Sequence, residues 1–284
     1  GLRARSLITK AYQFTTLAKS IADGKPCPFD YVVVDEAQDL GVAQLQFLAS
    51  IGAGRANALF FTGDLGQRIF QLPFSWKSLG VDIRGRSRTL RVNYRTSHQI
   101  RVQADKLLGP TLTDVDGITE NRNDTVSVFN GPSPTICIAE NEFDESKAVA
   151  EWLSAQFEAG VKPQEIGIFV RSEEQLLRAK DAVLQVGIPF QILDKDGHNA
   201  GNSLSISTMH LAKGLEFRSV IVMACDDEVI PLQTRIEAVG DDADLQEVYE
   251  TERHLLYVAC TRARDSLLIT GVEPASEFLD DLRS

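Results

Sequence analysis

The chain has 284 residues, 43% of them hydrophobic and 24% charged, with a formal net charge of −11. This is ordinary globular composition at a length that fits about two domains, so it excludes a disordered or fibrous chain. No apolar run reaches the roughly 18–20 residues of a membrane-spanning helix, and no signal-peptide core follows the N-terminus, so we expect a cytoplasmic protein without a membrane segment. The four cysteines are widely spaced, which disfavours a disulfide framework and a zinc site.

Short runs rich in Val, Ile and Phe that end in Gly, Asp or Ser are typical of buried parallel strands. In chain order they are Tyr31–Asp35, Leu59–Thr62, Thr135–Ala139, Ile166–Val170, Leu204–Thr208, Ser219–Ala224 and Leu267–Thr270. Apolar residues at helical spacing lie between them in Glu145–Phe157, Glu174–Val186 and Glu247–Arg262. This alternation predicts an α/β fold with a mostly parallel sheet. We expect a lobe junction around Gly80–Arg88 and surface excursions at Thr111–Pro134 and Asp194–Ser203.

Charge is distributed unevenly along the chain. Six arginines and no acidic residue lie between positions 84 and 101, whereas ten acidic residues and one base lie between 226 and 252. The overall negative charge argues against a nucleic-acid-binding protein, but arginine binds phosphate bidentately, so the first stretch favours a phosphate-binding face. The alternative for either stretch is a solvated surface.

The segment from Tyr31 to Asp39 predicts a buried strand that ends in two adjacent carboxylates, the Walker B arrangement. Such a strand delivers Asp35 to a Mg²⁺ shell, and Glu36 can activate a water against a γ-phosphate. Acidic capping of a helix that begins near Val42 is the alternative. It would account for Asp39, but it explains poorly why two acids stand directly at the strand end.

Five segments in order resemble motifs II to VI of the UvrD/Rep-type superfamily 1 DNA helicases. They are Asp35–Asp39 (Asp-Glu-Ala-Gln-Asp), Phe60–Phe70, Leu90–Ser97, Ile206–Phe217 and Glu252–Arg264. One such match could arise by chance, whereas five in the family's order are highly specific. The resemblance implies two RecA-like P-loop NTPase lobes with parallel sheets. It also implies ATP and Mg²⁺ as cofactors, and single-stranded DNA and duplex junctions as partners.

The resemblance implies a nucleotide site built from several motifs. The resemblance implies four catalytic residues, of which the two arginines would act as fingers on the γ-phosphate: Glu36, Gln67, Arg95 and Arg262. It implies four residues that bind the nucleotide: Asp35 through the metal, Asp64, Tyr94 near the adenine and Glu216 on the ribose. Simpler interpretations stay open for four of them. Gly63-Asp64 suits a plain turn, Arg95 a basic face, Arg262 a favourable cation at a helix C-terminus, and Tyr94 core packing.

DNA contacts are implied for motif V and for the segment after motif III. Thr208 and His210 would face the DNA backbone, although His210 alone also suits an ordinary surface histidine. Phe70 and Trp76 are candidates to stack on bases. The chain departs from the family here, because Leu72 and Pro73 stand where an aromatic residue and an arginine are expected; His254 also replaces a common arginine in motif VI.

No Gly-x-x-x-x-Gly-Lys-[Ser/Thr] P-loop occurs in the chain. The family places it before motif II, so we expect an incomplete first lobe at 1–88, a second lobe at 89–284 and a P-loop in an upstream part of the same helicase. About 110 residues separate Arg95 from Thr208, which leaves no room for a large accessory subdomain.

The expected function is the C-terminal portion of an ATP-dependent DNA helicase or translocase. It would move 3′→5′ on single-stranded DNA, in replication, repair or recombination, and this chain would be inactive alone. The alternatives are a non-catalytic helicase-like scaffold or binding module, and an RNA-directed or nuclease-coupled motor.

Overall fold

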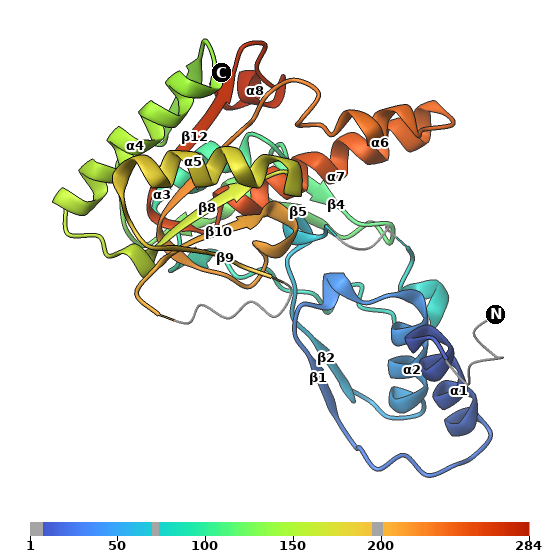
Figure 1. Cartoon of the computed structure of the whole chain (residues 1–284). Helices are drawn as coiled ribbons and strands as arrows, with labels where there is room; N and C mark the ends of the chain where they lie inside the picture. Colours follow the sequence, from blue (N-terminus) through green and yellow to red (C-terminus); the bar gives the residue numbers. More distant parts are fainter. Residues whose placement is uncertain (1–7, 70–73, 195–200, 284) are drawn as a thin grey trace. The chain divides into compact units, whose positions relative to one another are not determined.

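The computed structural model describes residues 8–69, 74–194 and 201–283, which form two compact units (Figure 1). Unit 1 consists of Gly1–Thr89 and Leu112–Glu120, and unit 2 of Leu90–Thr111 and Asn121–Ser284. The chain therefore passes from one unit to the other three times. The return of 112–120 to unit 1 has no counterpart in the sequence-based boundary, which is a single junction.

Unit 1 is built on a two-stranded parallel sheet with two helices beside it (Figure 1). Its elements before the junction are α1 (Lys10–Ala22), β1 (Val32–Val34), η2 (Ala37–Asp39), α2 (Val42–Gly52), β2 (Leu59–Phe61), η3 (Leu65–Gln67) and η4 (Lys77–Leu79). The strands pair in register with Val33 opposite Phe60. These two side chains are 73% and 61% exposed, so one face of the sheet is largely uncovered.

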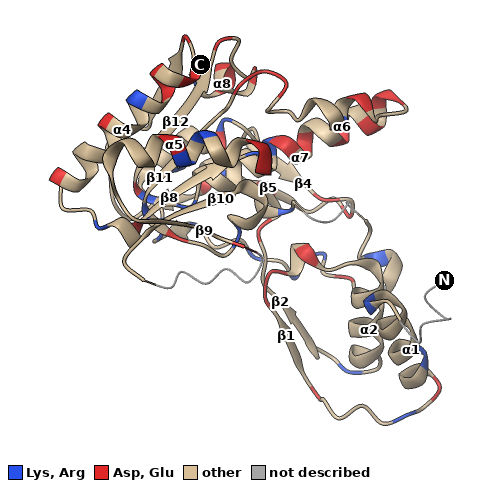
Figure 2. Cartoon of the chain, in the orientation of Figure 1, with Lys and Arg blue, Asp and Glu red and all other residues tan. Residues whose placement is uncertain are grey.

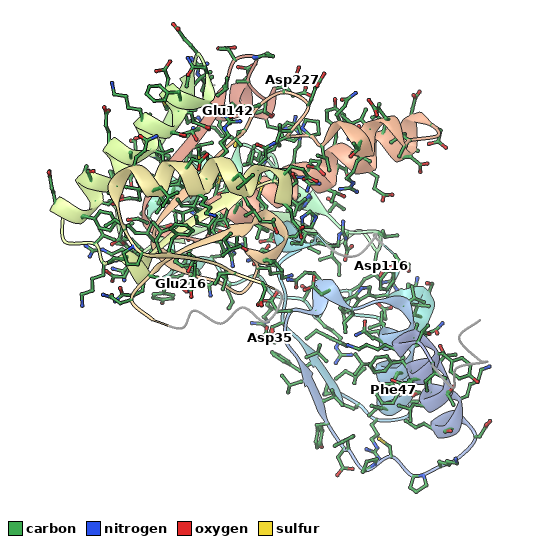
Figure 3. The ribbon with its side chains drawn as sticks, viewed as in Figure 1. Asp35, Phe47, Asp116, Glu142, Glu216 and Asp227 are labelled. Carbon is green, nitrogen blue, oxygen red and sulfur yellow. The ribbon has the colours of Figure 1, made fainter. Side chains whose placement is uncertain are left out.

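Asp116 fixes the returning segment onto unit 1. The short strands β4 (Thr111–Thr113) and β5 (Thr119–Asn121) pair with each other, and Asp116 lies in the turn between them. Its carboxylate accepts hydrogen bonds from Ser75 Oγ at 2.5 Å and from the backbone amides of Trp76 and Lys77 at 2.7 and 3.1 Å (Figure 3). The turn thus holds the start of η4 through three hydrogen bonds.

Unit 2 centres on a six-stranded parallel sheet with the strand order β7-β12-β11-β8-β10-β9. The strands are β7 (Thr135–Ala139), β8 (Ile166–Val170), β9 (Phe190–Ile192), β10 (Leu204–Thr208), β11 (Phe217–Val222) and β12 (Ala263–Val272). All five residues of β8 are buried, which explains its unbroken apolar sequence. Gly167 within β8 has no room for a side chain, because a Cβ there would lie 2.6 Å from the ring of Phe217.

Helices cover both faces of this sheet. α4 (Glu142–Glu158) and α5 (Leu176–Val186) pack together and bury Val149, Leu153 and Val183 against alternate strand residues. α3 (His98–Asp105) and α7 (Asp242–Cys260) contact β11 and β12 from the opposite side. Asn141 and Asp241 cap α4 and α7 by accepting from backbone amides of the first turn, at 3.0 and 2.9 Å. Among the described residues, no helix is both long and apolar enough to cross a membrane.

The remaining elements of unit 2 are short. They are β3 (Val92–Asn93), paired in parallel with β6 (Val126–Ser127), the helices α6 (Gln233–Glu237) and α8 (Phe278–Arg283), and the 3-10 turns η5 (Arg122–Asp124), η6 (Pro163–Glu165), η7 (Glu173–Gln175) and η8 (Met209–Leu211).

The predicted α/β fold with parallel sheets is confirmed. The differences lie at element ends, in short elements and in α1, a helix of 13 residues that was not predicted. β12 begins four residues before the predicted Leu267, because its polar start at Arg264 and Asp265 gives no apolar signal. α7 begins five residues before Glu247, since its acidic first turn is stabilised by capping and not by burial. The predicted excursion Thr111–Pro134 contains β4, β5 and β6. Much of the excursion Asp194–Ser203 lies outside the described residues.

Candidate nucleotide and nucleic-acid site

Two exposed carboxylates follow the carboxyl end of β1 in unit 1 (Figure 3). Asp35 Oδ1 accepts from the Thr62 hydroxyl at 2.5 Å and from the Glu36 amide at 2.9 Å, and these hydrogen bonds lower the pKa of Asp35. No described residue donates to Asp35 Oδ2. Glu36 has a left-handed backbone with φ 53°, which turns the chain from the strand into η2. The strand end therefore presents an ionised carboxylate to solvent.

This arrangement suits Mg²⁺ that is shared with phosphate oxygens. Protein-bound Mg²⁺ usually takes one or two carboxylates and completes its shell with waters and substrate phosphates. Asp35 supplies such a carboxylate, and the Thr62 hydroxyl lies beside it. Within the described ranges no group of three or more His, Cys, Asp or Glu side chains could hold a metal ion by itself.

The turn after β2 joins this carboxylate pair through one amide. Asp64 accepts from Gly66 N and from Gln67 Nε2, both at 2.8 Å, and its own amide donates to Gln38 Oε1 at 3.1 Å. Gln38 Nε2 donates to Glu36 Oε2 at 2.5 Å. Three predicted site residues, Glu36, Asp64 and Gln67, are therefore linked by Gln38, which sequence reasoning did not single out. Its place inside the Asp-Glu-Ala-Gln-Asp run was the available signal.

Within unit 2, residues of motifs IV, V and VI meet around the turn at 213–216. Arg95 Nε lies 2.9 Å from Glu216 Oε2, and the two side chains are 49% and 47% exposed. Arg262 is only 1% exposed, and its guanidinium donates to the carbonyls of Val258 at 3.0 Å and Leu215 at 3.4 Å. Arg95 is therefore accessible, whereas Arg262 binds carbonyls at the end of α7 and in the motif V turn.

Tyr94 stands next to Arg95 and is 74% exposed. Core packing, the simpler interpretation of this tyrosine, is therefore wrong.

The predicted DNA-binding residues of motif V follow β10. Thr208 ends the strand and His210 lies in η8, and both are half-buried. Burial lowers the pKa of His210; Arg171 and Arg235 lower it further, while Glu252 opposes them. Glu252 is fully buried in α7 and accepts from Arg171 at 2.5 and 2.6 Å and from Arg235 at 2.9 Å. His210 thus sits beside a buried ionic cluster and not on an open surface.

The two aromatic residues predicted to stack on bases have different outcomes. Trp76 is half-buried and packs edge-on against Phe61, with ring centroids 5.0 Å apart. Its ring is partly used for packing in unit 1. Phe70 lies outside the described residues.

The arginine stretch is largely neutralised by neighbouring acids. Four ion pairs account for this: Arg84 with Asp82, Arg91 with Asp124, Arg95 with Glu216, and Arg101, which is buried, with Asp105. Acidic residues are frequent along the first half of α7, where the ribbon is coloured red (Figure 2). Arg84, Arg86 and Arg88 lie in unit 1 and the other three arginines in unit 2, and the phosphate-binding face stays a prediction.

The parallel sheets define an α/β protein, the fold class to which the RecA-like lobes of helicases belong. The UvrD/REP helicase N-terminal domain model matches residues 3–75, and the UvrD-like helicase C-terminal domain model matches residues 193–273. The chain belongs to the UvrD-like DNA helicase family.

Several proteins that the chain resembles are described as DNA helicases. The chain is 25% identical over 256 residues to a "Probable DNA helicase" from Mycoplasma pneumoniae, covering 87% of this chain and 44% of that protein. It is 39% identical over 79 residues to "ATP-dependent DNA helicase PcrA" from Staphylococcus aureus, covering 28% and 10%. A solved C-terminal domain of a possible DNA helicase from Lactobacillus matches with 21% identity and a TM-score of 0.46, covering 67% of this chain and 94% of that chain. The chain spans less than half the length of either of these two relatives.

Proposed function

We propose that this chain is the C-terminal part of an ATP-dependent DNA helicase or translocase that moves 3′→5′ on single-stranded DNA. Residues 1–88 would form the end of the first RecA-like lobe and 89–284 the second lobe. The observation that carries the proposal is the hydrogen-bonded group of Glu36, Gln38, Asp64 and Gln67 beside Asp35. This group lies after the ends of two paired strands, and it places a candidate general base (Glu36) and a candidate γ-phosphate sensor (Gln67) beside a candidate metal ligand (Asp35).

Each side chain has a role that its contacts support. Asp35 would hold Mg²⁺, which neutralises charge on phosphate oxygens when bound. Glu36 would accept the proton of the attacking water, and Gln67 would orient that water. Arg95 would stabilise charge on the transferred phosphate after leaving Glu216. That exchange is easy, because an exposed ion pair contributes only about 0–1 kcal/mol.

The same proposal assigns a P-loop to an upstream part of the polypeptide. Parallel sheets are normally covered on both faces, and a sheet of two strands is marginal by itself. Val33 and Phe60 lie on an exposed face of the β1–β2 sheet. Further strands and helices of a first lobe would extend this sheet and cover that face.

Single-stranded DNA is the proposed track, with Thr208 and His210 on its backbone and Phe70 or Trp76 against its bases. The half-buried positions of Thr208 and His210 after β10 support contact through a restricted surface. DNA and not RNA is proposed because the relatives that the chain matches are described as DNA helicases.

Substitution of the two carboxylates tests this function in a polypeptide that joins the chain to its upstream P-loop segment. Glu36→Gln keeps the shape but removes the base, so nucleotide binding should survive while turnover falls by at least about 10²-fold. Asp35→Ala should lose Mg²⁺-dependent nucleotide binding. Asp30→Asn, an exposed change in unit 1, is the matched control. Normal ATP hydrolysis by both variants would show that the carboxylates are not the catalytic pair.

A non-catalytic helicase-like binding module is the second candidate. One observation favours it: the Arg262 guanidinium is buried and donates to protein carbonyls. This alternative predicts single-stranded DNA binding without any ATP turnover by the same joined polypeptide.

A further inference from the structure

Gln38 occupies the centre of the hydrogen-bonded group in unit 1, and its side chain amide has two different partners. The residue is 8% exposed. Its Nε2 donates to the Glu36 carboxylate and its Oε1 accepts from the Asp64 amide. A carboxylate needs a donor and an N–H needs an acceptor, so the two partners require opposite ends of a carboxamide. Neither a carboxylate nor an apolar side chain of similar size satisfies both.

Gly63 provides the space in which this amide lies. A Cβ at position 63 would lie 2.5 Å from Gln38 Oε1, whereas the next nearest atoms are the backbone nitrogens of Ala37 and Gln38 at 3.3 and 3.4 Å. Gly63 does not have the positive φ that by itself favours glycine. The φ of Gly63 therefore does not require glycine. The Gln38 amide is the nearest obstacle to a side chain at position 63, and the two backbone nitrogens are close contacts as well.

Glu36 needs such a partner, because a glutamate exposed to solvent samples several rotamers unless something holds it. A general base works only when it lies within hydrogen-bond reach of the proton it removes. The amide of Gln38 ties Glu36 to the backbone of Asp64, and the Asp64 side chain in turn binds Gln67. Gln38 thus links the position of the base to the segment that carries the phosphate sensor.

We infer that Gln38 is a positioning residue for Glu36 and that Gly63 is its steric complement, so that the two act as one interlock between motifs II and III. This inference rests on the proposed function for its catalytic meaning. The interlock itself does not, because its contacts lie within unit 1 and can be tested by stability.

The first experiment is a double-mutant cycle in the 284-residue chain, read by thermal unfolding of unit 1. Gln38→Ala removes the amide, and Gly63→Ala displaces it, so each single change should lower the unfolding midpoint. In the Gln38→Ala background the nearest obstacle to the added methyl group is gone and only the two backbone contacts remain, so Gly63→Ala should have a smaller effect than in the wild type. Strictly additive shifts would overturn the interlock.

The second experiment measures kcat and KM for ATP in the joined polypeptide. Gln38→Ala and Gly63→Ala should each lower kcat about 10- to 100-fold, the range expected for loss of a hydrogen bond to a charged group, with KM within about twofold. The double variant should be no slower than the slower single variant. Gln38→Glu should be as slow as Gln38→Ala, because it replaces the donor that faces Glu36 with a second carboxylate.

Gln46→Ala, at an exposed position of α2, is the matched control and should keep wild-type kcat and stability. Wild-type kcat in Gln38→Ala, measured beside an active wild type, would overturn the positioning role and leave the proposed function intact. A wild type without ATP turnover would instead overturn the proposed function, and the catalytic meaning of Gln38 with it.

Discussion

Arg95 and Glu216 hold each other in the structure, although the sequence motifs give them separate tasks on the phosphate and on the ribose. Their side chains meet at 2.9 Å and remain about half exposed. An ion pair of this kind adds little stability, because water and salt screen it. Under the proposed function, the loss of this ion pair should therefore affect nucleotide binding more than the stability of the fold.

Glu216→Gln should weaken nucleotide binding several-fold and leave the thermal unfolding midpoint almost unchanged. The amide still reaches a ribose hydroxyl, but it no longer accepts as strongly as a carboxylate. Calorimetric titration of the joined polypeptide with a nucleotide, together with thermal unfolding, measures both quantities. Glu151→Gln removes a comparably exposed partner, that of Lys147, and is the control. Unchanged nucleotide affinity would remove Glu216 from the site.

His210 should make stability depend on pH in a direction set by its environment. Burial and the nearby arginines lower its pKa, so the unfolded chain takes up a proton at a higher pH than the folded chain does. The stabilising contribution is therefore present above the ordinary histidine pKa of about 6.5 and is lost as pH falls below it. We expect the unfolding midpoint of wild type to fall relative to that of His210→Gln as the pH is lowered from about 8 to about 5. Parallel curves would contradict this.

For single residues, the sequence predicts the chemical role of a side chain better than it predicts which residue that side chain contacts. Asp35 and Glu36 were predictable because a strand end fixes where the next residues lie. Gln38 was not, since its role depends on Asp64, which is 26 positions away in sequence. The burial of Arg262 could not be foreseen either, because a cation at a helix C-terminus suits both capping and phosphate contact.

Among elements, burial decides which ones the sequence reveals. β7, β8 and β10 begin and end where their apolar runs predict. α1 is different: its Phe14, Leu17, Ala18 and Ile21 lie at helical spacing, so this helix could have been predicted from sequence and was not. β9 was missed because three residues at a sheet edge are too short to show a period.

α7 carries a fully buried charge at Glu252. Glu252 in this helix binds Arg171, which directly follows β8, and Arg235 of α6. Removing one member of a buried ionic cluster leaves the others uncompensated, which typically costs about 3–5 kcal/mol.

Glu252→Gln should therefore lower the free energy of unfolding of unit 2 by about 3–5 kcal/mol in urea denaturation. Glu250→Gln changes an exposed glutamate of the same helix and should stay within about 0.5 kcal/mol of wild type. Equal effects of the two substitutions would mean that the cluster does not anchor α7.

At the scale of the whole molecule, the division into units was only partly accessible from sequence. A Gly- and Arg-rich stretch marks the first passage between units, because it lacks any apolar period. The return of 112–120 depends on Asp116 binding residues about 40 positions earlier. No local pattern encodes a contact at that separation.

The central claim is that the chain holds one part of a divided nucleotide site and needs a P-loop that its own sequence lacks. Phosphoryl transfer depends mostly on positioning and charge stabilisation, so Glu36 and Arg95 have no fixed target without a phosphate cradle. The most direct measurement is ATP turnover at saturating single-stranded DNA, for the 284-residue chain and for the polypeptide joined to its upstream P-loop segment. The account predicts no turnover by the chain and DNA-stimulated turnover by the joined polypeptide. DNA-stimulated turnover by the 284-residue chain itself would contradict it.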